Sequence, residues 1–401
     1  MPDPIPPDFR VPGFLASGIA AGIKKNQAKD LALIYSEVPA TAAGVFTTNR
    51  AKAAPVLVSA DRVRSGVARA IVANSGCANS CTGQKGLADV LQLSRSIASP
   101  LKIRPATVLV ASTGVIGKPL PMDVMEKGIP LLVSSLSPDG LPDAAQAIMT
   151  TDTVAKAAIS RGNVHGKEIT VAGMAKGAGM ISPKMATLLV FVLTDAAISK
   201  SALQKALQQG VEGSFNRITV DGDMSTNDTL LVLANGKAGN PEIAPVSRAF
   251  RDFSLLLNDL LFALARKVAA DGEGATKLVK IMVEGAKTLS DAQKVARAVA
   301  NSPLVKTAFF GEDANWGRIL CAAGYSGAAI DPGRVDIDFD DVAVVRRGLG
   351  SGPGQEEPAT SVMKKQEYTV RINLNQGTRS TFLLTTDISI DYVKINGSYR
   401  S

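Results

Sequence analysis

The stretch KGAGMISPKMATLLVFVL, residues 176–193, places one threonine where a glycine-rich turn becomes an apolar run. The hydroxyl of Thr187 stands between Ala186 and Leu188, at the start of a segment that a buried strand could occupy. Threonine is β-branched and favoured in strands, so one interpretation is an ordinary strand residue. The other is that the chain is cut here, which makes Thr187 a new amino terminus. The rest of the sequence has to distinguish the two.

Five further polar segments stand among apolar or small residues. Their groups are costly to bury unless each is hydrogen-bonded, and a hydrogen-bonded turn explains any one of them alone. Five together, without a metal, triad or phosphate motif, indicate a site built from hydroxyls, backbone amides and a few charges. Such a site suits acyl transfer by an activated hydroxyl. The segments are STGVIG (112–117), MTTDT (149–153), SFNRITVDGDMSTNDT (214–229), DGEGATK (271–277) and GEDANWGR (311–318).

The glycines of residues 176–193 do not form a nucleotide site. Gly177 and Gly179 match the first two glycines of the dinucleotide fingerprint, but the third position is Ser182. Lys184 does not stand in the GKT or GKS ending of a phosphate loop. Both motifs also need a helix after the glycines, whereas an apolar strand-like run follows here.

Cysteine and histidine are too sparse for a metal centre. Cys77 and Cys81 lie four residues apart, and Cys321 is distant; no second Cys or His pair completes a metal site. We interpret the three as buried or idle thiols in a reducing compartment. The single histidine, His165, lies in the loop-like RGNVHGKE and is expected at the surface. The sequence therefore predicts no metal and no cofactor.

Composition and charge narrow the class of protein. The chain has 401 residues, of which 46% are hydrophobic, and its longest apolar run falls far short of the roughly 18 residues of a membrane span. The N-terminus is proline-rich and lacks an apolar signal segment, so a cytoplasmic protein is expected. The net charge of +8 comes from scattered basic doublets with little aromatic interleaving, which disfavours nucleic acid and suits small anionic substrates.

Hydrophobic patterning predicts the elements that must position these groups. Amphipathic helices are expected over 253–271 and from a Ser290 cap to just before Pro303, the second with Ala292, Val295, Ala296 and Val299 inward. Residues 348–361 are expected to be an irregular loop. Half-buried strands alternate with helices without regular βαβ spacing, which predicts an α+β layered sandwich. Strands are expected at 31–36, 70–75, 106–112, 168–175, 188–195, 278–285, 335–340 and 368–374.

Nearly the whole chain, from about residue 11 to the end, resembles the ornithine acetyltransferase family, the glutamate N-acetyltransferases of arginine biosynthesis. The motifs occur in family order, which makes the resemblance specific. They are GVFTTNRAKAAPV, ANSGCANSCTG, STGVIG, TTDT, KGAGMISPKMATLLVFVLTDA, SFNRITVDGDMSTNDT, DGEGATK, GEDANWGRI and TTDISIDYVKINGSYRS.

The resemblance implies specific roles. Members cut themselves before the threonine of an Ala-Thr-Met-Leu-type motif, here Ala186-Thr187-Leu188-Leu189, so Thr187 corresponds to the nucleophile. Its new α-amine, with a pKa of about 7.7–8.0, would act as the base without any histidine. Thr113 and Gly114 match the oxyanion-hole pair. The substrate contacts correspond to Thr150, Lys176, Thr187, Glu273, Asn396 and Ser401.

The resemblance also implies a fold, an assembly and a reaction. The fold is a layered α/β sandwich shared with self-processing aminopeptidases of the DmpA type. Acetyl would pass from N-acetylornithine to Thr187 and then to glutamate, with ping-pong kinetics. The chain would yield an alpha chain, 1–186, and a beta chain, 187–401, which assemble as two alpha and two beta chains. This processing boundary need not be a domain boundary.

Some residues depart from the family pattern, and some alternatives stay open. Lys184 stands where a neutral polar residue is usual, Cys77 replaces an asparagine, and Ser401 replaces a terminal threonine. A self-processing peptidase of the same fold, or a non-catalytic amino-acid-binding protein, would also use this scaffold. No local motif decides whether acetyl-CoA is a second donor; we expect a bifunctional enzyme over a monofunctional one.

Overall fold

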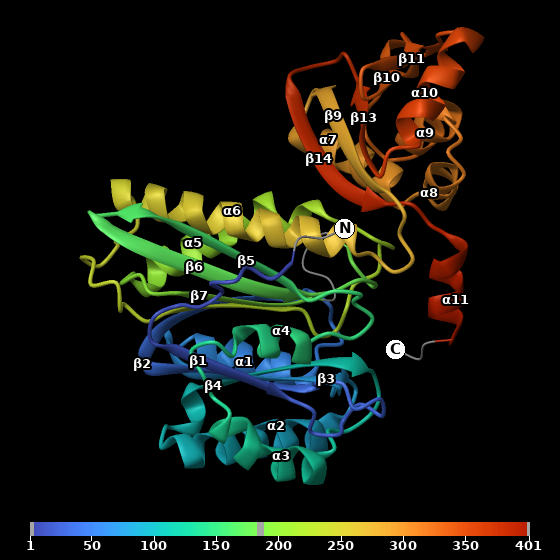
Figure 1. Ribbon diagram of the computed structural model, residues 1–401. Helices are drawn as coiled ribbons and strands as arrows, with labels where there is room; N and C mark the ends of the chain where they lie inside the picture. The colour runs from blue at the N-terminus through green and yellow to red at the C-terminus, as the bar shows by residue number, and fades with distance from the viewer. Residues whose placement is uncertain (1–3, 183–187, 399–401) are drawn as a thin grey trace. The chain divides into compact units, whose positions relative to one another are not determined.

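The computed structural model describes residues 4–182 and 188–398 (Figure 1). It divides into two compact units. Residues up to Asn216 and Asp223–Val268 form the first unit, while Arg217–Gly222 and the chain from Ala269 onward form the second. The processing boundary expected at 186/187 falls inside the first unit, and Ala186 and Thr187 themselves lie outside the described residues.

The first unit is built on an eight-stranded sheet in the order β4-β3-β2-β8-β7-β6-β5, with β1 paired to β2. The pairs β3/β4 and β7/β8 are parallel and the others antiparallel. In a parallel pair the two strands end at the same edge of the sheet. Residues that follow β3 and β4 therefore lie close together, and so do residues that precede β7 and β8. The strands are β1 (Phe14–Ile19), β2 (Leu31–Phe46), β3 (Val67–Cys77), β4 (Val108–Val115), β5 (Lys156–Val164), β6 (Lys167–Lys176), β7 (Leu189–Thr194) and β8 (Thr229–Ala234).

Helices cover this sheet in layers. One sheet face packs against α4 (Leu141–Ala147) in a core of alanine, leucine and phenylalanine side chains. On the other face, α2 (Gly83–Leu101) and α3 (Met122–Ser134) pack on β2, β3 and β4. Leu260 and Leu264 of α6 (Arg248–Ala270) lie over Gly173 of β6, and Figure 1 shows α5 (Lys200–Gly213) beside α6. The unit also contains α1 (Ala54–Val63) and the 3₁₀ turns η1 (Pro105–Thr107) and η2 (Phe215–Arg217). The predicted α+β layered sandwich is confirmed.

The second unit has its own sheet and core. Its six strands run in the order β12-β11-β10-β13-β9-β14. Small and branched side chains of α7 pack on β9 and β14, as the inward alanine and valine pattern predicted. The elements are β9 (Leu278–Ala286), β10 (Asp336–Phe339), β11 (Val342–Arg346), β12 (Leu349–Gly350), β13 (Glu367–Asn373), β14 (Arg379–Thr386), α7 (Leu289–Asn301), α8 (Pro303–Phe310), α9 (Trp316–Gly324), α10 (Glu356–Met363), α11 (Ile390–Ser398), η3 (Pro332–Arg334) and η4 (Pro353–Gln355).

Two local predictions are wrong. The N-cap of α7 is Thr288, whose hydroxyl accepts a hydrogen bond from the amide of Asp291 (3.0 Å), and Ser290 lies within the first turn. Residues 348–361 are not an irregular loop throughout, because α10 begins at Glu356. Two acidic residues in the first turn of α10 favour a helix start, and the burial of Ala359 and Met363 holds the helix on the core. Within the described chain, no helix has the length and apolarity needed to cross a bilayer.

A lysine lies in the core of the second unit. Lys306 of α8 is 1% exposed, and its ammonium donates to the hydroxyls of Thr385 (3.0 Å) and Thr386 (3.2 Å) and to the carbonyl oxygen of Thr386. Burial lowers the pKa of Lys306 to about 7, although the carboxylates of Asp387 and Asp221 act in the opposite direction. Below pH 7 Lys306 is protonated in the folded chain, and the burial of this ammonium away from water lowers the free energy of unfolding.

This burial predicts a pH-dependent stability. Between pH 7 and pH 10.5 the unfolded chain retains the Lys306 proton that the folded chain has lost, so the free energy of unfolding rises with pH. Lys306→Met removes this contribution. The difference in unfolding free energy between wild type and variant should change by roughly 2 kcal/mol between pH 7 and pH 9. Urea unfolding followed by the fluorescence of Trp316, the single tryptophan, measures it. A difference that stays constant with pH would contradict the assignment.

Candidate active site

The expected oxyanion pair ends a buried strand. Thr113 and Gly114 lie near the end of β4, and in the parallel register with β3 Gly114 faces Gly76. Gly114 has φ +126°, and a Cβ there would lie 2.5 Å from the carbonyl carbon of Gly76. Only glycine fits both the conformation and the space. The close approach of the two backbones therefore fixes the peptide that follows Thr113.

The side chain of Thr113 is set up as a donor. It is 5% exposed, and its Oγ1 accepts a hydrogen bond from the ammonium of Lys176 (3.2 Å), which is 3% exposed at the end of β6. Because the oxygen accepts from a cation, its own hydrogen is left to donate and is polarised by the charge. A hydroxyl and a glycine amide at adjacent positions can stabilise an oxygen that becomes negative during acyl transfer.

Asp152 joins the Thr150 turn to the end of β6. Its carboxylate accepts hydrogen bonds from the amides of Thr150 (2.9 Å) and Gly177 (2.7 Å) and from the ammonium of Lys156 (2.6 Å). The side chains of Asp152 and Lys156 are both 0% exposed. Burial alone would raise the pKa of Asp152, but the ammonium groups of Lys156 and Lys176 outweigh it and lower this pKa to about 2. The carboxylate is therefore ionised at neutral pH.

A further lysine, Lys24, contacts the turn that contains Thr150. The ammonium of Lys24 donates to the carbonyl oxygens of Met149 (2.7 Å) and Lys29 (2.9 Å). Burial and the nearby charge of Lys176 lower the pKa of Lys24, against the opposing charges of Asp30 and Asp152. The peptide between Met149 and Thr150 is thus held at its carbonyl by Lys24 and at its amide by Asp152.

The STND turn, Ser225–Asp228, connects β4, which carries Thr113, with β7, which follows Thr187 in the sequence. The amide group of Asn227 donates to the carbonyl oxygens of Ala78 (2.7 Å) and Ser112 (2.8 Å), the residue before Thr113. The next residue, Asp228, accepts from the amide of Leu188 (2.8 Å) through Oδ1. Parallel pairing of Leu189 with Thr229 fixes this register. Two successive side chains therefore hold the residue before Thr113 and the residue before β7.

In the second unit, two of the expected substrate contacts are paired. The side-chain amide of Asn396, on α11, donates to Glu273 (2.8 Å) and to the carbonyl oxygen of Tyr392 (3.1 Å). Glu273 is partly exposed, in the turn between α6 and β9. Gly274 has φ +64°, and a Cβ there would lie 2.5 Å from the amide nitrogen of Tyr392, so glycine is required beside Glu273.

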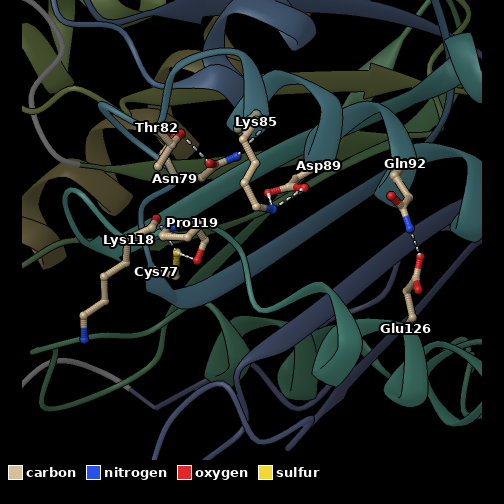
Figure 2. A network of polar contacts seen from close by, with 10 residues as sticks. Cys77, Asn79, Thr82, Lys85, Asp89, Gln92, Lys118, Pro119 and Glu126 are labelled. Atoms are coloured by element: carbon tan, nitrogen blue, oxygen red, sulfur yellow. Dashed lines mark hydrogen bonds and ion pairs between the residues drawn. The ribbon is translucent and has the colours of Figure 1, made fainter.

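The cysteines and the histidine stand apart from this chemistry. The sulfur of Cys77 is buried against the carbonyl oxygens of Lys118 (3.2 Å) and Pro119 (3.4 Å) (Figure 2), and burial raises the pKa of its thiol. Cys81 and Cys321 are exposed, and none of the three is in a disulfide. His165 is exposed, as predicted. Among the described residues no three His, Cys, Asp or Glu side chains are grouped as metal ligands would be.

The structure brings part of the predicted site together. Thr113, Gly114 and Lys176 adjoin, Thr150 is tied to Lys176 through Asp152, and Glu273 is bonded to Asn396. Ala186, Thr187, Ser401 and the divergent Lys184 lie outside the described residues. Sequence reasoning missed Asp152, Lys156, Asn227, Asp228 and Lys24. Asp152, Asn227 and Asp228 lie in the polar segments 149–153 and 214–229, and the polarity of those segments was the sequence signal that could have identified them.

An α+β sandwich that holds a buried hydroxyl and buried ammonium groups beside a half-buried glycine has the groups that an acyl-transfer enzyme needs. The family model of the ArgJ family matches residues 15–401. The arginine biosynthesis bifunctional protein ArgJ of Symbiobacterium thermophilum is 53% identical over 97% of this chain and 97% of its own length. That of Geobacter sulfurreducens is 50% identical over 98% of this chain and 100% of its own. The chain belongs to the ArgJ family.

A solved structure is also similar. The crystal structure of the arginine biosynthesis bifunctional protein ArgJ from Bacillus halodurans matches with a TM-score of 0.50 and 40% identity. The match covers 98% of that chain but 52% of this one. The solved chain is therefore about half as long as this protein.

Replacing the Asp152 carboxylate by a neutral group is expected to lower the free energy of unfolding substantially. Asp152→Asn removes the carboxylate paired with the buried Lys156 and should lower the free energy of unfolding by about 3–5 kcal/mol. Because the folded pKa of Asp152 is depressed, its contribution is complete above about pH 4 and is lost as the pH falls toward 2. Chemical unfolding of wild type and variant at pH 3, 5 and 7 measures this loss.

Asp89→Asn is a matched control. Asp89 pairs with Lys85 at the same four-residue spacing (Figure 2), but the side chain of that lysine is 64% exposed. A partner in solvent makes the pair worth only about 0–1 kcal/mol. Equal losses in the two variants, or a loss for Asp152→Asn that does not shrink at pH 3, would show that Asp152 is not stabilised as described.

Proposed function

We propose that this protein transfers an acetyl group from N-acetylornithine to glutamate through a covalent acetyl intermediate on Thr187. The products are ornithine and N-acetylglutamate. The proposal rests on family membership and on the chemistry held around Thr113, Lys176 and Asp152. We place it in the cytoplasm, with small molecules as its substrates and neither nucleic acid nor a membrane as a partner.

One observation carries the proposal. The STND turn holds the residue before Thr113 with Asn227 and the residue after Thr187 with Asp228. Residues next to the proposed oxyanion pair and next to the proposed nucleophile are therefore bonded to two adjacent side chains, and this link supports the assignment of both roles. A threonine whose only role was to favour a strand would not require such a link.

The reaction needs a base and an oxyanion site. The α-amine of Thr187 accepts the hydroxyl proton as the oxygen attacks the acetyl carbonyl of N-acetylornithine. The developing oxyanion is stabilised by the hydroxyl of Thr113 and the amide of Gly114, each worth about 2.7–4 kcal/mol. The amide C–N bond then breaks, the proton passes to the leaving amine, and ornithine departs. The amine of glutamate attacks the acetyl ester in the reverse sense.

Substrate recognition follows the charges. Lys176 is suited to a substrate carboxylate, beside the backbone of Thr150. Glu273 is suited to the side-chain ammonium of ornithine, and Asn396 and Ser401 complete the proposed contacts. Ornithine and glutamate share the α-carboxylate, so we assign Lys176 to both half-reactions.

Self-cleavage between Ala186 and Thr187 creates the amine. The half-length chain of the solved Bacillus halodurans protein supports a mature enzyme of separate chains. We propose an alpha chain, 1–186, and a beta chain, 187–401, assembled as two of each. The relatives from Symbiobacterium and Geobacter are called bifunctional, which supports acetyl-CoA as a second acetyl donor for glutamate. No resident cofactor is proposed.

Processing and transfer give a direct test. Purified protein should separate under denaturing conditions into fragments of 186 and 215 residues, the difference between 401 and 186, with the larger starting at Thr187. Thr187→Ala should remain intact and inactive. The cleaved enzyme should release ornithine from N-acetylornithine with glutamate present and form N-acetylglutamate in equal amount. Release of acetate at the same rate without glutamate would indicate a hydrolase, and an intact active chain would refute the nucleophile.

A further inference from the structure

The turn that carries Glu273 has a fixed backbone. The amide of Ala275 donates to the carbonyl oxygen of Gly272 (2.9 Å), which closes a four-residue turn with Glu273 and Gly274 at its centre. Gly274 has φ +64°, and a positive φ at the third position of a turn favours glycine. The position of the Glu273 side chain therefore depends on what anchors this turn.

Asp387, directly after β14, anchors the residues that leave the turn. It is 3% exposed, and its Oδ1 accepts hydrogen bonds from the amides of Thr276 (2.9 Å) and Lys277 (3.0 Å). Its Oδ2 accepts from the hydroxyl of Thr276 (2.6 Å). The chain after the Glu273 turn is thus bonded to the chain after β14, within the second unit.

Ser389 anchors the turn itself and also the first turn of α11. It is 5% exposed, and its hydroxyl donates to the carbonyl oxygen of Gly274 (2.6 Å) and accepts from the amide of Tyr392 (3.2 Å). Because α11 begins at Ile390, the second bond is that of an N-cap. A Cβ on Gly274 would lie 2.8 Å from the Ser389 hydroxyl oxygen and 2.5 Å from the Tyr392 nitrogen, so the turn and the helix start are in direct contact.

One hydroxyl therefore positions the segments that carry both members of a polar pair. Asn396 lies on α11, and its side-chain nitrogen donates to Oε2 of Glu273 (2.8 Å). Within the described chain, Oε1 of Glu273 and the side-chain oxygen of Asn396 accept no further hydrogen bond. An alkylammonium has three hydrogens to donate and suits a pair that offers two acceptor oxygens, one of them charged.

We propose that Ser389 is a positioning residue for an alkylammonium site formed by Glu273 and Asn396, and that it gives this site its preference for ornithine. This inference rests on the proposed function, which assigns those two residues to the substrate. Ornithine ends in an ammonium, whereas the side chain of glutamate ends in a carboxylate. Ser389 therefore contributes to the binding of N-acetylornithine and leaves the acetyl-transfer step unchanged.

Ser389→Ala tests this role, because it removes both hydrogen bonds of the hydroxyl. KM for N-acetylornithine should rise about 10-fold with kcat changed by less than about 2-fold, since the lost interaction serves binding alone. KM for glutamate should change by less than about 2-fold. Ser389→Thr retains a hydroxyl and should restore KM for N-acetylornithine to within about 2-fold of the wild-type value.

A double-mutant cycle shows whether Ser389 acts through Glu273. Glu273→Gln removes the charge of the site and should itself raise KM for N-acetylornithine. Adding Ser389→Ala to Glu273→Gln should raise this KM by less than about a further 2-fold, because residues that act through one another are not additive. Effects that multiply in the double variant would overturn the inference.

Ser302→Ala is the matched control. Ser302 is 6% exposed, lies in the same unit and caps α8 by accepting from the amide of Val305 (3.4 Å). It should lose comparable stability, as measured by urea unfolding, and keep the wild-type KM for both substrates. A rise in KM that came only from a weakened helix cap would appear in both alanine variants.

The outcomes separate the inference from the proposed function. Wild-type protein that does not transfer acetyl would refute the proposed function and the inference with it. Active wild type with equal KM values in the Ser389→Ala and Ser302→Ala variants would overturn the role of Ser389 alone, as would an equal rise in KM for glutamate and N-acetylornithine. Should Ser389→Ala fail to fold, Ser389→Gly takes its place, because glycine caps a helix almost as well as serine, and the same comparison of KM values decides.

Discussion

A carboxylate buried away from water must be neutralised where it stands, and Asp152 imposes that condition on the centre of the first unit. Its charge is balanced by Lys156 in the core and by Lys176 nearby. Once ionised, the same group can satisfy the amides of Thr150 and Gly177, which belong to different segments of the chain. The turn before β5 and the end of β6 are therefore held together by one charge. Loss of that charge would release both.

The other side of the site depends on backbone approach. Gly76 and Gly114 allow β3 and β4 to come close where the strands end, which directs the peptide after Thr113. Asn227 then satisfies the carbonyl oxygens that these strand ends expose. Lys176 links the two sides, because it donates to Thr113 and also acts on Asp152. The arrangement supplies hydrogen-bond donors and cations for an acyl group and a carboxylate.

Much of the fold follows from local patterns, because buried strands and amphipathic helices have short periods. The strands β6 and β7 around the glycine-rich turn and the inward face of α7 were predictable in this way. The cap of α7 was not, because Thr288 and Ser290 are both suitable hydroxyls and the choice depends on where the chain leaves β9. Helix α10 was missed because its glycine-rich approach resembles a loop, while its stability comes from packing on the core.

The site residues show the same division. Resemblance to a family supplied Thr113, Lys176 and Glu273, whereas hydrogen bonds between distant segments revealed the others. Asp152 bonds Gly177, 25 residues later, and Asp228 bonds Leu188, 40 residues earlier. The two units could not be read from the sequence either, since Arg217–Gly222 joins the second unit through the bond from Thr219 to Leu384 (2.9 Å). Such pairings depend on topology, which composition and period do not encode.

Trapping the acetyl intermediate tests the central claim most directly. Cleaved enzyme is mixed with N-acetylornithine, or separately with acetyl-CoA, in the absence of glutamate, then quenched in acid and weighed by mass spectrometry. We predict that the fragment 187–401 gains the mass of one acetyl group on Thr187, and that later addition of glutamate removes it. An active enzyme whose fragment never gains acetyl from N-acetylornithine, or gains it at another residue, would contradict acyl transfer through Thr187.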